Sequence, residues 1–185
     1  HFRIASQGFW SSCHDENCLV RAMHGKIDAM LIIHVDDLLL AMNKDALDIL
    51  YAACVDKFKK VKRNPLPFVY IGVRHMLPRP HRLMLDQEEY LAKVQPVELT
   101  RERRREDSAF LTATESAAFR SLLCSLLWVV QTRTDLAHDV VRLQSEMVCP
   151  QVLHADEVNN LRRRAIATAP GNGLHYRKLE FPLRV

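Results

Sequence analysis

The segment Met30–Met42, which reads MLIIHVDDLLLAM, constrains this chain more than any other. Two apolar runs of strand length, Met30–Val35 and Leu38–Met42, are separated only by Asp36 and Asp37. Two polar residues between two such runs predict a tight β-hairpin. Because the runs are apolar on both faces, we expect the hairpin to be largely buried. Unpaired carboxylates are costly to bury, so the turn is expected to face water, a metal ion or a cationic partner.

Size and charge set broad limits. The chain has 185 residues, enough for one domain or one and a half with a hydrophobic core. A net charge of +4 permits a nucleic-acid partner without requiring one. No apolar run reaches the roughly 18 residues that a membrane span needs, so no membrane partner is expected. The chain begins at His1 without a leader-like segment, and we interpret it as an interior piece of a longer protein.

The five cysteines are odd in number and scattered, which favours reduced thiols in an intracellular protein. Cys54 and Cys124 lie in apolar helical patterns and are expected in the core. A zinc site is the least favoured alternative, since its candidate ligands have a spacing that fits no common zinc module. These candidates are Cys13, His14, Cys18 and His24.

Beyond the first hairpin, the sequence predicts a helix over 46–58 with an N-cap at 43–45. The basic run Lys57–Arg63 is either a solvated helix end or a contact with nucleic-acid phosphates. A second hairpin is expected from strands 68–76 and 82–85, joined by a turn at 78–81.

The remaining chain is expected to be mainly helical. A helix capped at Asp86 should run to about residue 94, followed by an exposed, highly charged linker. Helical patterns then start near residues 114, 135 and 153, and short strands are expected near the end. The first of these helices should bury a wide stripe of Phe119, Leu122, Leu123, Leu126, Leu127 and Val130. The terminal strands should cover 174–177 and 181–185.

The segment His34–Asp37 resembles the Tyr-x-Asp-Asp motif of reverse transcriptases, and its surroundings resemble the Ty1/copia class of retrotransposon polymerases. Six further segments are similar to that class in the same order along the chain. They are Gly8–Trp10 and Asp15–Leu19 before the hairpin, and Phe68–Val73, Phe119–Trp128, Thr132–Ala137 and Gly173–Arg177 after it.

This resemblance implies an α+β fold: antiparallel palm-type hairpins with packed helices, then a mainly helical thumb/connection module. Residues 1–97 would form the lower palm, with the Asp-Asp hairpin and a primer-grip-like hairpin. Residues 98–113 would be a polar linker and 114–169 the thumb/connection. Residues 170–185 would lead into an RNase H domain whose carboxylates lie beyond the chain.

The implied activity is RNA-directed DNA polymerase, a nucleotidyltransferase that acts by two-metal phosphoryl transfer. By resemblance, Asp36 is the main ligand of Mg²⁺ or Mn²⁺ and Asp37 supports it, although Asp is also a common turn residue. In the family another catalytic Asp lies upstream, so this segment is expected to carry half of an active site and to be inactive alone.

The resemblance implies further site residues around the two carboxylates' motif and in the second hairpin. His34 stands where the family has Tyr and would contact the primer terminus. Tyr70, Ile71 and Gly72 would form the primer-grip-like strand, with Gly72 allowing close backbone approach or a bulge. Lys62 is a weak candidate for the general acid, because its local sequence departs from the family motif.

The implied partners are an RNA or DNA template–primer duplex, dNTPs and the rest of the Pol polyprotein, in cytoplasmic particles and the nucleus. Exposed arginines on the helices are candidates for contact with the duplex. These arginines are Arg120, Arg133 and Arg142. The alternative function is a non-catalytic nucleic-acid-binding or interaction remnant of a decayed retroelement.

Overall fold

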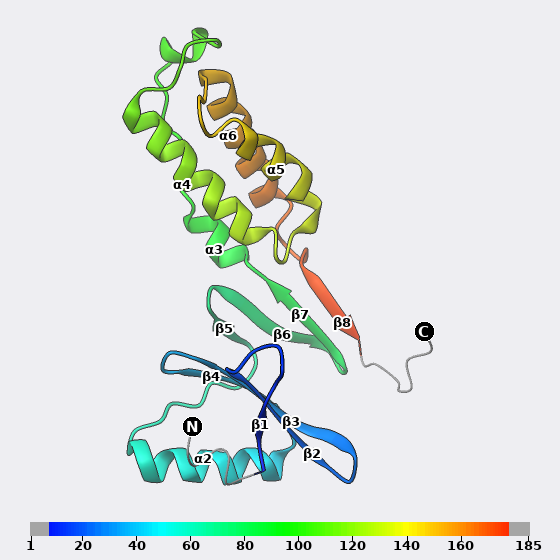
Figure 1. The fold of residues 1–185 in the computed structure, drawn as a ribbon. Helices are drawn as coiled ribbons and strands as arrows, with labels where there is room; N and C mark the ends of the chain where they lie inside the picture. The colour runs from blue at the N-terminus through cyan, green and yellow to red at the C-terminus, as the bar shows by residue number, and fades with distance from the viewer. Residues whose placement is uncertain (1–7, 178–185) are drawn as a thin grey trace. The chain divides into compact units, whose positions relative to one another are not determined.

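The computed structural model describes residues 8–177, which divide into two compact units at 64/65. Each unit has a hydrophobic core of its own. Figure 1 shows the helices and strands of both units. The fold is α+β, with two four-stranded antiparallel sheets and a mainly helical C-terminal part, which confirms the expected class at that level. Within residues 8–177, no helix combines the length and apolar composition needed to cross a membrane.

Within residues 8–64, the first unit is one sheet with one helix. Strands β1 (Trp10–Ser11), β2 (Cys18–Met23), β3 (Lys26–His34) and β4 (Asp37–Met42) pair in sequence order. Helix α2 (Lys44–Phe58) follows, and the side chain of its N-cap Asn43 accepts a hydrogen bond from the Ala46 N–H at 2.8 Å. The core between helix and sheet consists of Phe9, Leu19, Ala29, Leu31 and Leu50.

Only one face of the β3–β4 hairpin is buried. Ala29 and Leu31 point into the core, whereas the alternate residues Met30 and Ile32 are 41% and 37% exposed. The expectation of a largely buried hairpin is therefore wrong for the second face. Apolar residues on both faces indicate that both can be covered, but residues 8–64 supply a single helix, and it packs on one side.

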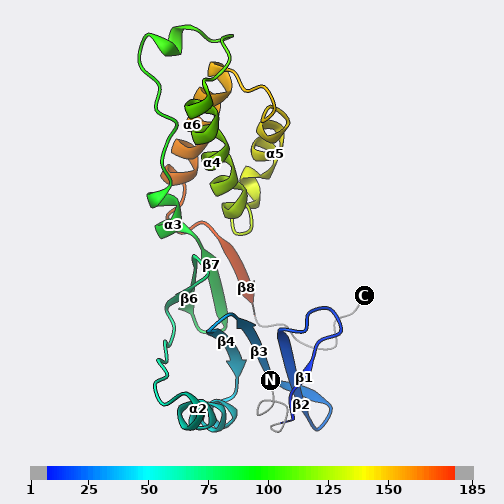
Figure 2. The same cartoon turned by 60° about the vertical axis from the view of Figure 1, so that its left-hand side comes forward.

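The sheet of the second unit joins segments far apart in the sequence. Its order is β5 (Phe68–Tyr70), β6 (Val73–Arg79), β7 (Arg82–Asp86) and β8 (Leu174–Arg177), and Figure 2 shows β8 beside β7. The strand at 174–177 is thus confirmed, while the strand expected at 181–185 lies outside the described residues.

The strand expected over 68–76 is interrupted. Tyr70 pairs with Val73, so Ile71 and Gly72 form a tight turn, with φ of 48° and 73°. The next turn is also tighter than expected, because Arg79 pairs with Arg82 and leaves only Pro80 and His81 in the bend. Both hairpins therefore use two-residue turns, with positive φ at Ile71 and Gly72 in the first turn and at His81 in the second.

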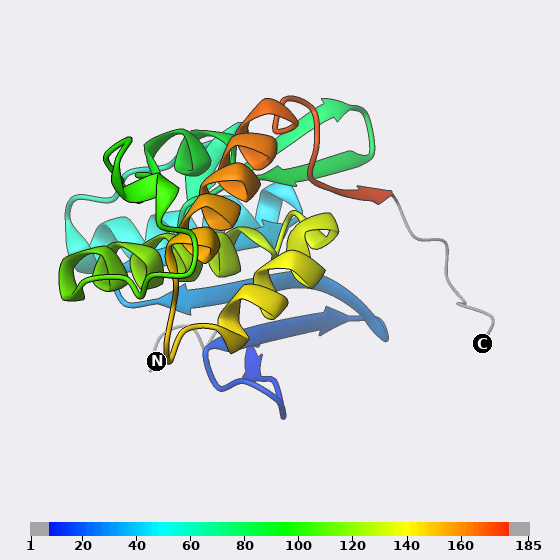
Figure 3. The same cartoon turned by 90° about the horizontal axis from the view of Figure 1, so that it is seen from above.

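Helices form the rest of the second unit. Figure 3 shows the three longer ones, α4 (Ala113–Val129), α5 (Ala137–Ser145) and α6 (Val152–Ala167), gathered in a bundle. Shorter elements precede α4 and α5. They are α3 (Glu88–Lys93) and the 3₁₀ turns η1 (Arg103–Arg105) and η2 (Thr134–Leu136).

The core of this bundle follows the predicted stripe of α4 in large part. Phe119, Leu122, Leu123 and Leu126 are buried, while Leu127 is exposed. Cys124 is also exposed and Cys54 only half-buried, so the expectation that Cys124 belongs to the core is wrong. Cys124 lies on the side of α4 opposite the buried stripe. Its apolar neighbours Leu122, Leu123 and Leu126 are buried on the other side.

The segment expected as a polar linker is held to the helices. The Arg103 guanidinium donates to the Glu115 carboxylate at 3.1 Å and to the Phe110 carbonyl at 2.5 Å. Earlier in the chain, Val97 is hydrogen-bonded through its backbone to Asn159 of α6. These contacts join residues 97–113 to the second unit, which begins at Pro65, whereas the sequence suggests boundaries at 97/98 and 113/114.

Candidate functional site

The two carboxylates of the first hairpin lie at its turn, and the turn is shifted by one residue from the expected position. His34 pairs with Asp37, so the two turn residues are Val35 and Asp36, and Asp37 begins β4. The predicted turn at Asp36–Asp37 is therefore corrected to Val35–Asp36. The expected and the observed register differ by two residues in the strand pairing, so each side chain lies on the same face of the sheet in both. The apolar pattern therefore does not distinguish the two registers.

The backbone of this turn is strained. Val35 has φ of 55° and is 88% exposed. Left-handed backbone is uncommon for a β-branched residue, and at the first position of a two-residue turn it is usually taken by Gly. Strain of this kind persists where surrounding structure enforces it and is frequent at functional sites. The strained residue directly precedes Asp36.

The turn offers oxygen ligands to solvent. Asp36 and Asp37 are exposed, and His34 lies across from Asp37 on the adjoining strand. Magnesium takes carboxylate oxygens together with several waters, and adjacent carboxylates on a fixed turn match that preference. In residues 8–177, no group of three or more His, Cys, Asp or Glu side chains is placed to hold a metal ion. The described site therefore supplies two carboxylates.

Nearby acidic and cysteine residues do not add to it. The Arg21 guanidinium hydrogen-bonds Asp28 at 2.5 Å and lowers the pKa of that carboxyl, so Asp28 serves a cross-strand ion pair. The zinc alternative gains no geometric support, because no such group of ligands forms among the described residues, which include Cys13, His14, Cys18 and His24.

The remaining expected site residues fall in both units. Lys62 is exposed in the segment after α2, in the same unit as the Asp36–Asp37 turn. Tyr70, Ile71 and Gly72 belong to the second unit, where the last two form the β5–β6 turn instead of a bulge. A Cβ on Gly72 would make only ordinary contacts, 3.5 Å from Trp128 Nε1, so its φ of 73° explains the glycine.

One of the three arginines expected at a duplex has a structural role. Arg133 is buried and donates to Asp135 at 2.8 Å, to Thr168 Oγ1 at 2.8 Å and to the Ala165 carbonyl at 3.2 Å. Its guanidinium lowers the pKa of Asp135. The expectation that Arg133 contacts nucleic acid is therefore wrong. Arg120 is exposed, and Arg142 is paired with Glu157 at 2.8 Å.

Sequence reasoning missed a cluster of charged side chains on the β6–β7 hairpin, centred on the buried Asp86. Arg74 Nε lies 3.1 Å from both carboxylate oxygens of the buried Asp86, and Arg74 also donates to Glu88. Ion pairing with these carboxylates, above all Asp86, raises the pKa of Arg74. The available signal was the opposite charges of Arg74 and Asp86 on the two strands of a predicted hairpin. Their pairing depends on the strand register, which the apolar pattern leaves open.

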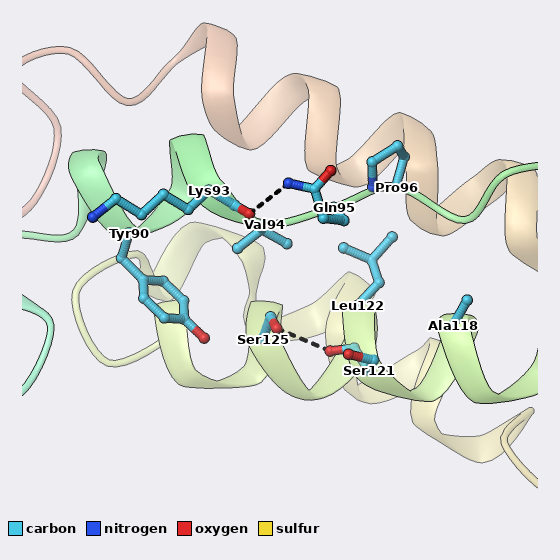
Figure 4. Close-up of a pocket in the computed structure, with 9 residues that line it drawn as sticks. All are labelled: Tyr90, Lys93, Val94, Gln95, Pro96, Ala118, Ser121, Leu122 and Ser125. Carbon is cyan, nitrogen blue, oxygen red and sulfur yellow. Dashed lines mark hydrogen bonds between the residues drawn. The ribbon is translucent and has the colours of Figure 1, made fainter.

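A recess of about 340 Å³ lies between α3, the segment after it and α4 (Figure 4). Its polar groups are partly satisfied by backbone: Ser125 Oγ donates to the Ser121 carbonyl and Gln95 Nε2 to the Lys93 carbonyl, both at 2.9 Å. Its lining includes no His, Cys, Asp or Glu, and its ionisable side chains are Tyr90 and Lys93.

In comparisons with known proteins, no family model, no curated protein and no solved structure matches the chain.

Proposed function

We propose that this chain is the C-terminal part of the polymerase domain of a Ty1/copia-type reverse transcriptase. In the intact parent it adds dNTPs to a primer on an RNA or DNA template, with Mg²⁺ or Mn²⁺ as cofactor. The first unit and the β5–β7 hairpins would be the lower palm, and the α4–α6 helices the thumb/connection. The ordered set of similar sequence segments supports this assignment.

The observation that carries the proposal is the pair of adjacent, exposed carboxylates at the β3–β4 turn. Phosphoryl transfer to a primer needs metal ions that hold the attacking and leaving oxygens in line. Small displacements of reacting groups are costly, so the ligands must be carried on a rigid base. A hairpin within a four-stranded sheet, packed on α2, is such a base.

Two carboxylates are not a complete two-metal site. Each Mg²⁺ prefers six oxygen ligands, and charge from a third carboxylate would hold the pair of ions. We therefore propose that Asp36 and Asp37 bind a single divalent ion weakly in this chain. We expect no primer extension from the chain alone, because the described residues bring no third carboxylate to Asp36 and Asp37.

Paramagnetic Mn²⁺ tests the proposal directly. We expect low concentrations of Mn²⁺ to broaden the NMR signals of residues around 34–38 first, because the broadening falls steeply with distance from the ion. Asp36→Asn should remove this selective broadening. The matched control Asp107→Asn, at an exposed acid of the second unit, should leave it unchanged. Equal broadening at 34–38 in wild type and Asp36→Asn would refute the metal site.

Two assays on the same proteins separate the candidate functions. Template–primer binding without carboxylate-dependent Mn²⁺ broadening would favour the non-catalytic nucleic-acid-binding module. Primer extension by the chain alone, lost in Asp36→Asn, would support a polymerase but refute the half-site.

A further inference from the structure

Seven residues at the end of α2 carry a concentrated positive charge. Lys57, Lys59, Lys60, Lys62 and Arg63 are all exposed, and no acidic residue lies among them. Phe58, in the middle of this group, is 62% exposed. We call residues 57–63 the basic segment.

The basic segment folds back along the helix that precedes it. Lys59 ends α2 with φ of 63°, and its N–H donates to the Val55 carbonyl at 2.9 Å. The Tyr51 hydroxyl then donates to the Val61 carbonyl at 3.4 Å, and Arg63 lies 3.4 Å from Asp48. Because its contacts move to earlier helix residues as the chain advances, the segment lies alongside α2 from Val55 back to Asp48.

Helix capping does not account for this charge. Cations suit the C-terminal end of a helix dipole, but the effect is confined to about the last turn. It covers Lys57, whereas Lys60, Lys62 and Arg63 lie beyond the C-cap Lys59. The ion pair between Arg63 and Asp48 joins two half-exposed side chains, and such pairs contribute little to stability. The segment thus presents cations that the fold does not need.

We propose that the basic segment is a binding site for single-stranded nucleic acid. Sequence-independent binding of single strands combines cations along the backbone with an aromatic face on which an unpaired base stacks. Lys60 and Lys62 supply phosphate contacts, and Phe58 supplies the aromatic ring. Lys57 Nζ already lies 5.4 Å from the centroid of that ring, which places a cation beside the stacking position.

The chemistry of α2 favours a nucleic-acid strand over an anionic membrane. The exposed face of the helix carries Asp45, Asp48 and Asp56, which a bilayer along the helix would bring against anionic headgroups. A membrane-surface helix also needs a free apolar face, whereas Ala46 and Leu50 of α2 are buried in the core. A strand can contact the basic end alone. This site does not depend on the proposed polymerase activity, because it requires no metal ion.

Binding of the full chain to a fluorescein-labelled 20-nucleotide oligo(dT) tests the site by anisotropy. We expect the triple variant Lys57→Gln/Lys60→Gln/Lys62→Gln to bind about ten-fold more weakly at low salt. The slope of log affinity against log salt should fall by about 2, since each phosphate contact contributes roughly 0.7 for single strands. Phe58→Leu should weaken binding at least about five-fold and leave the slope unchanged, because it removes stacking alone.

The control removes the same net charge elsewhere. Lys26→Gln/Arg101→Gln/Arg105→Gln replaces three exposed cations outside the segment and should bind oligo(dT) like wild type. Loss of binding equal to that of the first triple would overturn the site, as would absence of binding by wild type at low salt. Equal affinity for duplex DNA, together with no effect of Phe58→Leu, would overturn the single-strand assignment.

Two further arms distinguish the other outcomes. If the lysine triple loses sedimentation with phosphatidylserine vesicles but keeps oligo(dT) binding, the partner is a membrane and the proposal is wrong. Asp36→Asn/Asp37→Asn should keep full oligo(dT) affinity. The metal site and the basic segment can therefore fail independently of each other.

Discussion

Asn159 is a single buried side chain that joins two segments of the second unit. Its Oδ1 accepts from the Val97 N–H at 2.9 Å, and its Nδ2 donates to the Val97 carbonyl at 2.8 Å. The side-chain amide of Asn159 thus pairs with both backbone polar groups of Val97, a residue outside the helices and strands. A buried donor and acceptor left without partners would be costly.

We expect Asn159→Leu to lower the free energy of unfolding of the second unit by about 2–4 kcal/mol, since it leaves both polar groups of Val97 unpaired. The neighbouring exposed residue provides the control: Asn160→Ala should change it by no more than about 0.5 kcal/mol. Urea denaturation followed by circular dichroism measures both. Similar stability of the two variants would mean that water replaces the Asn159 contacts.

His75 makes the second unit sensitive to pH. Burial lowers the pKa of His75, and a hydrogen bond to the Val73 carbonyl opposes this effect. The unfolded chain takes up a proton near pH 6.5, where the folded chain still resists it. The free energy of unfolding should therefore be at its full value above about pH 6.5 and fall as the pH drops toward the lower folded pKa.

The replacement His75→Phe keeps a flat ring against Phe68, whose centroid lies 4.9 Å away, and cannot take up a proton. Urea titrations between pH 7.5 and 5 should show a shallower decline in this variant. His138→Gln, at an exposed site on α5, should decline as wild type does. A decline of unchanged steepness in His75→Phe would assign the pH dependence to other groups.

These residues show where sequence reasoning stops at the scale of single side chains. The exposed Asp36 and Asp37 were found because they interrupt an apolar pattern. Arg133 was read as a surface cation, although it is buried against Thr168 and Ala165. Thr168 and Ala165 lie more than thirty residues away from Arg133 in the sequence, and only the folded chain brings them together.

At the scale of elements, the Asp-bearing turn keeps an unfavourable residue at Val35. We expect Val35→Gly to raise the free energy of unfolding of the first unit by about 0.5–1 kcal/mol. Relief of left-handed strain exceeds the entropy cost of glycine there. Val148 is equally exposed, at 88%, and has no left-handed backbone, so Val148→Gly should not stabilise the chain. Thermal melts of the two variants provide the measurement.

Elements with strong local signals were predicted closely. Asn43 begins α2, and a capping box of Thr112 and Glu115 begins α4, within two residues of the expected starts. The hairpin turns were predicted less well. The strand expected over 68–76 was predicted to continue through Ile71 and Gly72, because the sequence stays largely apolar there. In the structure the backbone reverses at these two residues.

On the scale of the whole molecule, the two units have separate cores, centred on Leu31 and on Leu123. We expect Leu31→Ala and Leu123→Ala each to cost about 3 kcal/mol, a typical value for a fully buried leucine. Each loss should appear in the signals of its own unit when NMR spectra are followed through a urea titration. Simultaneous shifts of both sets of signals in either variant would indicate one cooperative unit.

The overall class was predictable, since hairpins followed by long helical patterns indicate α+β. The division at 64/65 was not. Charge between residues 98 and 113 suggested a boundary, but Arg103 uses its charge to bind Glu115, and composition alone does not separate a solvated run from an internal ion pair.

Strand β8 has a consequence for the order of events during synthesis. Its partner β7 ends at Asp86, and β8 begins at Leu174, after the helices α3 to α6. A nascent chain must therefore carry β7 as an open edge until residue 177 has left the ribosome. Exposed edges recruit other strands, and pairing across so long a separation is slow. The helical bundle is thus free to assemble first, and closure of the sheet is the late step at which misassembly competes.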